Sequence, residues 1–217
     1  MDEHRRTSRD RAGLSREKVL DAALDLVDQV GAEGLSMRKL GAALGVEAMT
    51  VYYYVPSKDA LLAGLVERVT TRTFTVDPKA GWEETLRDYA CSFRRELLRH
   101  PGVAPLVATH PVTTPDALRM LEAAAGLLRA SGFGLREAFH VINTVGTFTT
   151  GHCLAEIDPP GGTPPELPDL DPATVLNVTE AVQDGLGTPQ DHQARFDFAL
   201  EALINGFTQA LAGRSAE

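Results

Sequence analysis

The sequence lacks the long apolar runs of a membrane protein. No stretch of its 217 residues approaches the ~20 apolar residues that a bilayer-spanning helix needs. The first fifteen residues are charged from the second position and have no apolar segment of the kind found in secretory signals. Cysteine is scarce: Cys91 and Cys153 have no CxxC partner, which argues against a disulfide framework or a zinc knuckle. We therefore expect a cytoplasmic protein that does not contact a membrane.

Signatures of catalysis are also absent. The chain contains no GxSxG, Walker or GxGxxG motif, and no carboxylate pair stands out from the surface charge. His140 and His152 lie twelve positions apart on one predicted helix, about 120° from a shared face, so they cannot hold a metal together. His100 and His110 flank a short predicted helix, where lone histidines more often cap helices or face solvent. We expect no enzyme, no bound metal and no cofactor.

The charge is unevenly distributed. The net charge is −9, but residues 1–60 contain nine Lys/Arg and ten Asp/Glu, whereas residues 61–217 contain twelve and twenty. Six basic residues crowd into the first eighteen positions. Taken alone, this basic segment is either a solvated tail or an arm that binds nucleic acid.

The hydrophobic pattern is helical almost throughout, and 43% of the residues are hydrophobic, as in ordinary globular chains. Ser15, Ser36 and Ser57 are placed as helix N-caps, and glycine or proline follows most periodic segments. No alternating strand pattern bounded by turns occurs. The pattern predicts an all-α fold with helices over residues 16–31, 36–45, 48–54, 57–74, 82–99, 103–109, 118–130, 135–156, 173–184 and 191–212.

Two domains are expected: an N-terminal arm with a small helical domain over residues 1–60, and a larger helical domain over residues 61–217. Between Asp158 and Pro172 there are six prolines and two glycines, which predict a mobile loop.

Residues 36–55 have the dimensions of a helix-turn-helix motif, with Gly45 at the tight turn. The second helix would present its first residues to a major groove. Three successive tyrosines, Tyr52, Tyr53 and Tyr54, cannot all be buried on a helix of two turns. By pattern alone, however, any helix pair in an α-helical bundle could look like this.

The stretch GAEGLSMRKLGAALGVEAMTVYYYVPSKDALL, within residues 14–69, resembles the DNA-binding domain of the TetR family of bacterial transcriptional regulators. The segments WEETLRDYACSFRRELLRHPG, LLRASGFGLREAF, VGTFTTGHCLAEI and FALEALINGF are similar to the C-terminal domain of the tetracycline-repressor branch. The resemblance implies a three-helix DNA-binding domain followed by a larger helical domain for ligand binding and dimerisation.

What the resemblance implies for DNA contacts can be carried over position by position. Arg38 falls where an arginine contacts a base, and Lys58 where a lysine binds a phosphate. Ala48 and Met49 depart from the branch, which carries glutamine and proline there, so a different operator sequence is expected. The expected DNA-binding residues are Ser36, Arg38, Ala48, Met49, Thr50, Tyr52, Tyr53, Tyr54 and Lys58.

Tetracycline repressors hold a magnesium–drug chelate with two histidines and, through water, with acidic and hydroxyl groups. The two histidine positions are Phe74 and Leu106 here, and an acidic position is Ala155, although Glu156 is adjacent. Apolar side chains cannot bind a hard divalent cation. The resemblance therefore implies a drier pocket for a mostly apolar molecule, although each residue could equally be ordinary core packing. The expected ligand-binding residues are Phe74, Tyr89, Phe93, Leu106, Thr109, Ile142, Asn143 and Thr147.

Together these features predict a homodimeric repressor, paired through helices 135–156 and 191–212, that leaves a palindromic double-stranded operator when a small-molecule effector binds. Two alternatives stay open, a helical enzyme and an interaction module that does not bind DNA.

Overall fold

We describe a computed structural model over residues 13–72, 74, 80–110, 112–157 and 171–214. Every regular element within these ranges is helical, which confirms the all-α prediction. The chain divides into two compact units between Leu154 and Ala155, and each unit is described by itself. The predicted N-terminal arm, and the predicted loop up to residue 170, lie outside the described residues. None of the helices within the described ranges is long and apolar enough to cross a membrane.

Three helices form the N-terminal head of the first unit: α2 (Arg16–Gly34), α3 (Met37–Leu44) and α4 (Ala48–Tyr54). Ser15 and Ser36 cap α2 and α3, each accepting a hydrogen bond from a backbone N–H three residues later at 3.2 Å. Buried aliphatic side chains join the three helices, among them Leu20 and Leu24 of α2, Leu40 of α3 and Val51 of α4. We call these three helices, residues 16–54, the head.

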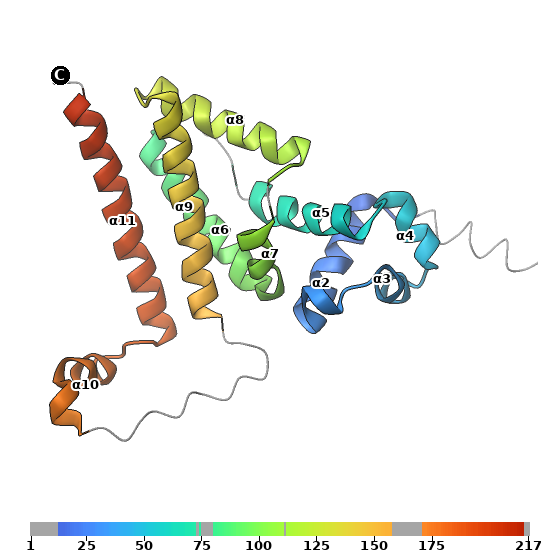
Figure 1. Cartoon of the computed structure of the whole chain (residues 1–217), viewed down its shortest axis with the longest axis horizontal. Helices are drawn as coiled ribbons and strands as arrows, with labels where there is room; N and C mark the ends of the chain where they lie inside the picture. The colour runs from blue at the N-terminus through green and yellow to red at the C-terminus, as the bar shows by residue number, and fades with distance from the viewer. Residues whose placement is uncertain (1–12, 73, 75–79, 111, 158–170, 215–217) are drawn as a thin grey trace, which may run out of the picture. The chain divides into compact units, whose positions relative to one another are not determined.

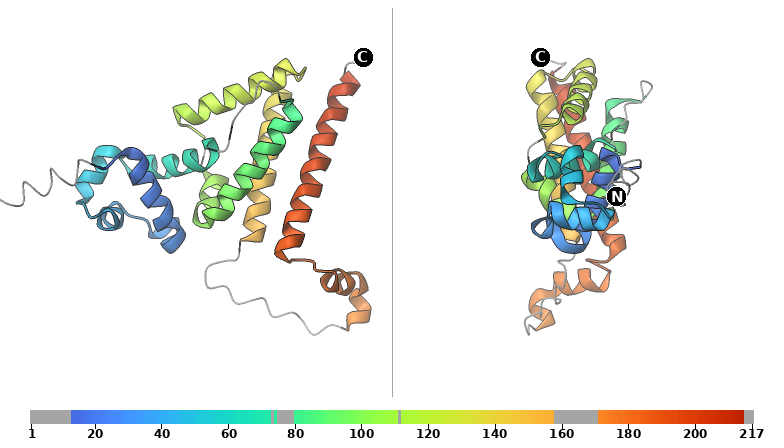
Figure 2. Two further views of the ribbon diagram at one scale, coloured as in Figure 1. Left: turned by 180° about the vertical axis from the view of Figure 1, so that it is seen from behind. Right: turned by 90° about the vertical axis from the view of Figure 1, so that its right-hand side faces the viewer.

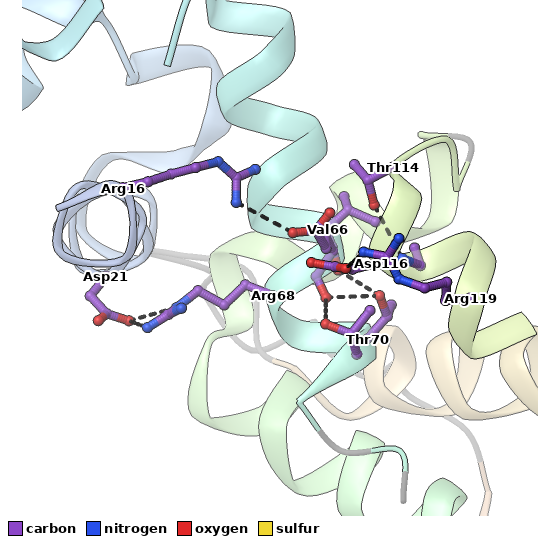
Figure 3. A network of polar contacts seen from close by, with 11 residues as sticks. Arg16, Asp21, Val66, Arg68, Thr70, Thr114, Asp116 and Arg119 are labelled. Carbon is purple, nitrogen blue, oxygen red and sulfur yellow. Dashed lines mark hydrogen bonds and ion pairs between the residues drawn. The ribbon is translucent and has the colours of Figure 1, made fainter. Parts of the chain in front are cut away.

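Helix α5 (Lys58–Thr71) continues directly from the head and is clamped to α2. Arg68 donates to Asp21 at 2.7 Å, a pair visible in Figure 3, and Arg16 donates to Glu67 at 3.4 Å. A Cβ on Gly64 would lie 2.8 Å from a methyl of Leu20, so any larger residue at position 64 would require the side chain of Leu20 to shift. The head and the first turns of α5 thus form one packed group.

The body, residues 82–154, comprises α6 (Trp82–Arg99), the 3₁₀ turn η1 (Pro101–Val103), α7 (Ala104–Thr109), α8 (Pro115–Ala130) and α9 (Leu135–Glu156) up to its Leu154. Trp82 packs edge-on against Phe133 with ring centroids 5.0 Å apart, as expected of a packing anchor. Figures 1 and 2 show α5 leading out of the head to the body, where it contacts α6, α7 and α8. One helix therefore joins the two regions of this unit.

The second unit contains η2 (Pro172–Val175), α10 (Leu176–Gln183) and α11 (Pro189–Arg214). Apolar side chains of α10 are largely exposed, namely Leu176, Val178 and Val182. On α11, Phe196, Leu200 and Ile204 are buried, whereas Phe198 is 79% exposed. Helix α11 thus carries large apolar side chains on more than one face.

Candidate functional site

The turn between α3 and α4 has the backbone geometry of a helix-turn-helix. Gly45 ends α3 in the left-handed conformation, with φ 69° and ψ 25°, which glycine adopts without steric cost. A Cβ on Gly41 would lie only 2.8 Å from the backbone oxygen of Val46. Two glycines therefore allow α3 and α4 to approach closely, and Val51, which is fully buried, anchors α4 from beneath.

The outer surface of α3 and α4 presents large side chains to solvent. Met49 is 73% exposed and Tyr53 is 84% exposed, which is unusual for side chains of this size and apolarity. Arg38, Tyr52 and Lys58 are exposed as well, whereas Ala48, Thr50 and Tyr54 are half-buried. The ring of Tyr54 packs edge-on against that of Tyr53 at 5.2 Å. Ser36 is the N-cap of α3, and its hydroxyl accepts from the N–H of Lys39.

A cavity of about 350 Å³ lies inside the body, between α5, α6, α7, α8 and α9. It has the size of a pocket for a drug-like small molecule. Its lining combines one wall of aromatic rings with aliphatic side chains from α7, α8 and α9. The lining residues are Thr70, Phe74, Leu86, Tyr89, Phe93, Val107, Ala108, Val112, Met120, Leu121, Ala124, Ile142, Asn143, Val145, Gly146, Thr147, Thr150, Gly151 and Leu154.

The aromatic wall is a continuous series of three rings. Phe74 meets Tyr89 edge-on at 5.7 Å, and Tyr89 is stacked on Phe93 at 5.5 Å, with 12° between the ring planes. Burial raises the pKa of the Tyr89 hydroxyl well above its usual range, because the low-dielectric surroundings disfavour the phenolate. A tyrosine is already protonated at neutral pH at its ordinary pKa, so the Tyr89 hydroxyl can donate a hydrogen bond, and burial extends this protonated state to higher pH.

Few polar groups in the cavity are available to a ligand. The hydroxyls of Thr70, Thr147 and Thr150 donate to carbonyl oxygens of their own helices at 2.7 to 2.9 Å. Among the described residues, the side chains of Tyr89 and Asn143 have no such partner. These two side chains are the polar groups that a bound molecule would meet.

The part of the cavity lining that the structure describes carries no charged side chain. None of the described lining residues is Asp, Glu, Lys, Arg or His. Across the described part of the chain, no three His, Cys, Asp or Glu side chains come close enough together to hold a metal ion. A hard cation such as Mg²⁺ needs several oxygen donors, and the cavity offers only neutral hydroxyl and amide groups.

The structure brings six of the eight expected ligand-binding residues to this cavity: Phe74, Tyr89, Phe93, Ile142, Asn143 and Thr147. Leu106 and Thr109 are not among its lining residues. On α7, Leu106 is buried away from the cavity, and the hydroxyl of Thr109 donates to the carbonyl of Pro105 at 2.9 Å. Successive helical residues differ by about 100°, so Val107 and Ala108 face the cavity in their place.

Sequence reasoning did not identify the wall that α8 contributes, formed by Met120, Leu121 and Ala124. Their spacing indicates an amphipathic helix, but it does not distinguish a side chain that faces a cavity from one packed in a core. The role of His100 was also missed. It ends α6, as its predicted capping role suggests, but its ring also contacts Asp28, 72 positions earlier in the sequence.

The comparisons with known proteins cover nearly the whole chain. Residues 19–65 match the family "Bacterial regulatory proteins, tetR family", and residues 75–211 match "Tetracyclin repressor-like, C-terminal domain". The tetracycline repressor protein class D of Escherichia coli is 36% identical over 208 residues, which cover 90% of each chain.

Two solved structures share the fold. A variant of TetR from Acinetobacter baumannii in complex with minocycline is 26% identical, with a TM-score of 0.68, over 91% of this chain and 95% of that one. ActR from Streptomyces coelicolor in complex with actinorhodin is 26% identical, with a TM-score of 0.73, over 92% and 99%. The chain belongs to the tetR family of bacterial regulatory proteins: it is a DNA-binding transcriptional regulator with a ligand-binding C-terminal domain.

Proposed function

We propose that the protein is a repressor that binds a palindromic operator as a homodimer and leaves it when a neutral, mostly apolar molecule enters the cavity of the body. The observation that carries this proposal is the course of α5. Its first residue, Lys58, follows the helix-turn-helix by three residues, and its last turn supplies Thr70 to the cavity wall. Phe74 extends that wall just beyond the helix.

The DNA contacts divide into two kinds. Arg38 is exposed at the start of α3 and can donate two parallel hydrogen bonds to a base edge, whereas Lys58 is a point charge suited to a phosphate. Met49 and Ala48 can offer only apolar contacts, such as those made with thymine methyl groups. Thr50, Tyr52, Tyr53 and Tyr54 can give hydroxyl hydrogen bonds to phosphates or bases. Ser36, as a cap, fixes the start of α3.

The effector follows from the chemistry of the cavity. A charged molecule would be stripped of water without gaining a counter-charge, which is costly, so a neutral molecule is favoured. The three rings suit a flat aromatic partner, and Tyr89 and Asn143 suit carbonyl or hydroxyl oxygens on it. The minocycline complex of one structural relative and the actinorhodin complex of the other support a small-molecule effector.

Release requires that the effector bind one head orientation better than another. A molecule that presses on Phe74 and Thr70, or that orders α7, would tilt α5 as a rigid lever. Because α5 is clamped to α2 by Asp21–Arg68 and Arg16–Glu67, the head would follow. Two recognition helices about 34 Å apart would then lose their register with successive major grooves.

For the dimer, we propose pairing through the helices at residues 135–156 and 191–212. The 79% exposure of Phe198 on α11, next to a stripe of buried residues, supports a helix covered on two sides. Leu203→Arg is expected to give a monomer by analytical ultracentrifugation at micromolar concentration. A variant that still dimerised normally would disprove this interface.

The proposed domain division near residue 60, the absence of catalytic activity and a cytoplasmic location fit a regulator that acts on chromosomal DNA. The deciding experiment is a gel shift with the DNA upstream of the protein's own gene, in the presence and absence of N-phenylnaphthylamine as a neutral aromatic probe. We expect a retarded complex that the probe weakens. Failure to form a complex with this DNA, and failure to select any binding duplex from a random library, would favour the interaction-module alternative.

A further inference from the structure

A second connection joins the head to the body, away from α5. Asp28, in the second half of α2, accepts two hydrogen bonds from the segment that follows α6. Its Oδ2 lies 2.8 Å from Nδ1 of His100, and its Oδ1 accepts from the backbone N–H of Gly102 at 3.0 Å. An ionised carboxylate can only accept, so Nδ1 of His100 carries the proton of that bond. The side chains of Asp28 and His100 are only 21% and 14% exposed.

The two backbones touch at this point. A Cβ on Gly102 would lie 2.5 Å from the carbonyl oxygen of Val27 and 3.0 Å from Cα of Asp28. Both obstacles are backbone atoms, which cannot rotate away as a flexible side chain could. Position 102 therefore requires glycine as long as η1 rests against α2.

This contact is continuous with the cavity wall. Val103 and Ala104, next after Gly102, are fully buried, and α7 begins at Ala104. Val107 and Ala108 on α7 line the cavity. Val107 is only five positions after Gly102, so a short segment separates the amide that Asp28 binds from a side chain that a ligand would touch. Buried, closely packed segments of this kind transmit displacements, because they cannot deform freely.

His100 is held from the body side as well. Its Nε2 lies 3.9 Å from Oε1 of Glu96, and Glu96 accepts from Arg99 at 2.8 Å. The separation of 3.9 Å is too long for a hydrogen bond, so the position of His100 is fixed through its backbone: it is the C-cap of α6, and its N–H donates to the carbonyl oxygen of Glu96 at 3.0 Å. Asp28 of the head thus contacts His100, whose position is fixed by the body.

We propose that Asp28 is a positioning residue for the allosteric response: through His100 and Gly102 it couples the head to α7 and to the cavity, in addition to the lever of α5. This inference rests on the proposed function, since it assumes that DNA and cavity influence one another. Coupling of this kind is reciprocal, so operator binding must alter α7 as much as an effector alters the head. The reciprocity allows a test that needs no effector.

The test is hydrogen–deuterium exchange of the full-length protein with and without saturating DNA. The probe is a 24-base-pair duplex selected from a random library with the purified protein. In the unaltered protein we expect DNA to slow exchange in α3 and α4 by direct contact, and to change exchange over residues 103–109 by about fivefold or more. In Asp28→Ala the head is expected to keep its protection while the change over residues 103–109 disappears.

Three further variants separate coupling from general damage. Asp25→Ala removes an exposed carboxylate from the same helix and is expected to behave like the unaltered protein. Asp28→Asn keeps an oxygen for the N–H of Gly102 and is expected to restore an intermediate change over residues 103–109. Gly102→Ala forces η1 away from Val27 and is expected to uncouple the two regions without altering Asp28.

The outcomes are distinct. If the DNA-induced change in exchange over residues 103–109 persists in Asp28→Ala and Gly102→Ala, the role of Asp28 is overturned. It is also overturned if DNA protects the head of the unaltered protein but leaves exchange over residues 103–109 unchanged. If Asp28→Ala loses head protection as well, recovery in Asp28→Asn supports the proposal and failure to recover overturns it. If no duplex protects the head of the unaltered protein, the proposed function itself fails.

Discussion

The head and the body place their large side chains in opposite ways. In the head, glycine brings α3 and α4 close together, aliphatic residues fill the core, and Met49 and Tyr53 are exposed to solvent. In the body, Tyr89 and Phe93 turn inward and, together with Phe74 from beyond the end of α5, line an unfilled space of about 350 Å³. The head is thus a rigid surface made for a partner outside, whereas the body leaves room for a partner inside. A regulator needs both, because a tightly packed body would have no second state to stabilise.

The largest expected effect tests this difference in packing. Leu40→Ala removes a fully buried side chain from the tightly packed head and is expected to cost about 2–5 kcal/mol of unfolding free energy. Leu121→Ala, at the cavity wall, removes a side chain that already borders empty space, so a cost below about 1.5 kcal/mol is expected. Urea denaturation of both variants measures the difference. Equal losses would mean that the cavity wall is as well packed as the head.

The head could be predicted from the sequence more fully than the cavity of the body. Ser15, Ser36, Ser57 and Gly45 are local signals, since a cap or a left-handed turn depends on a few neighbouring residues, and the structure confirms each of them. The cavity depends on the rotation of each helix about its axis. One residue of rotation on α7 exchanges the expected Leu106 for Val107.

Contacts between distant segments were beyond sequence reasoning altogether. Asp28 and His100 are 72 positions apart and carry no motif, and only packing in three dimensions brings them together. The exposure of Tyr53, by contrast, followed from counting, because a helix of two turns cannot bury three adjacent tyrosines. Local geometry was predictable, whereas the faces of packed helices and the junction between regions were not.

The next effect concerns the two kinds of DNA contact on the head. Arg38→Ala is expected to cost about 1–3 kcal/mol of operator binding and to relax discrimination at one base pair of each half-site. Lys58→Ala is expected to weaken binding to all sequences alike and to reduce the slope of log K against log salt by about one per half-site. Fluorescence anisotropy at several salt concentrations, with matched and mismatched duplexes, separates the two. Identical changes in affinity and selectivity would contradict this division of roles.

A smaller effect is expected from the Tyr89 hydroxyl at high pH. Its pKa is raised in the folded protein by burial, whereas the unfolded chain ionises near the ordinary value of about 10. The stability that Tyr89 contributes is therefore fully present below pH 10, and it falls as the pH rises above 10, because the unfolded state alone loses its proton. Tyr89→Phe should show a shallower decline in urea midpoint between pH 9 and pH 11 than the unaltered protein. Parallel curves would show that the phenol is open to solvent.

The last prediction is that Mg²⁺ has no effect. This lack of response distinguishes the cavity from those that bind a magnesium–drug chelate. Because the described lining residues offer no carboxylate or imidazole, Mg²⁺ has no fixed donor in the cavity. Adding millimolar Mg²⁺ should leave the affinity for N-phenylnaphthylamine unchanged, and tetracycline with Mg²⁺ should not dissociate the operator complex. Phe74→Ala provides the matched comparison: it enlarges the cavity and removes one of the three rings, so the response to the neutral probe should change while the response to Mg²⁺ stays absent. Release by micromolar tetracycline with Mg²⁺ would show that water or residues outside the described ranges supply the missing donors, and the argument from an uncharged cavity would fail.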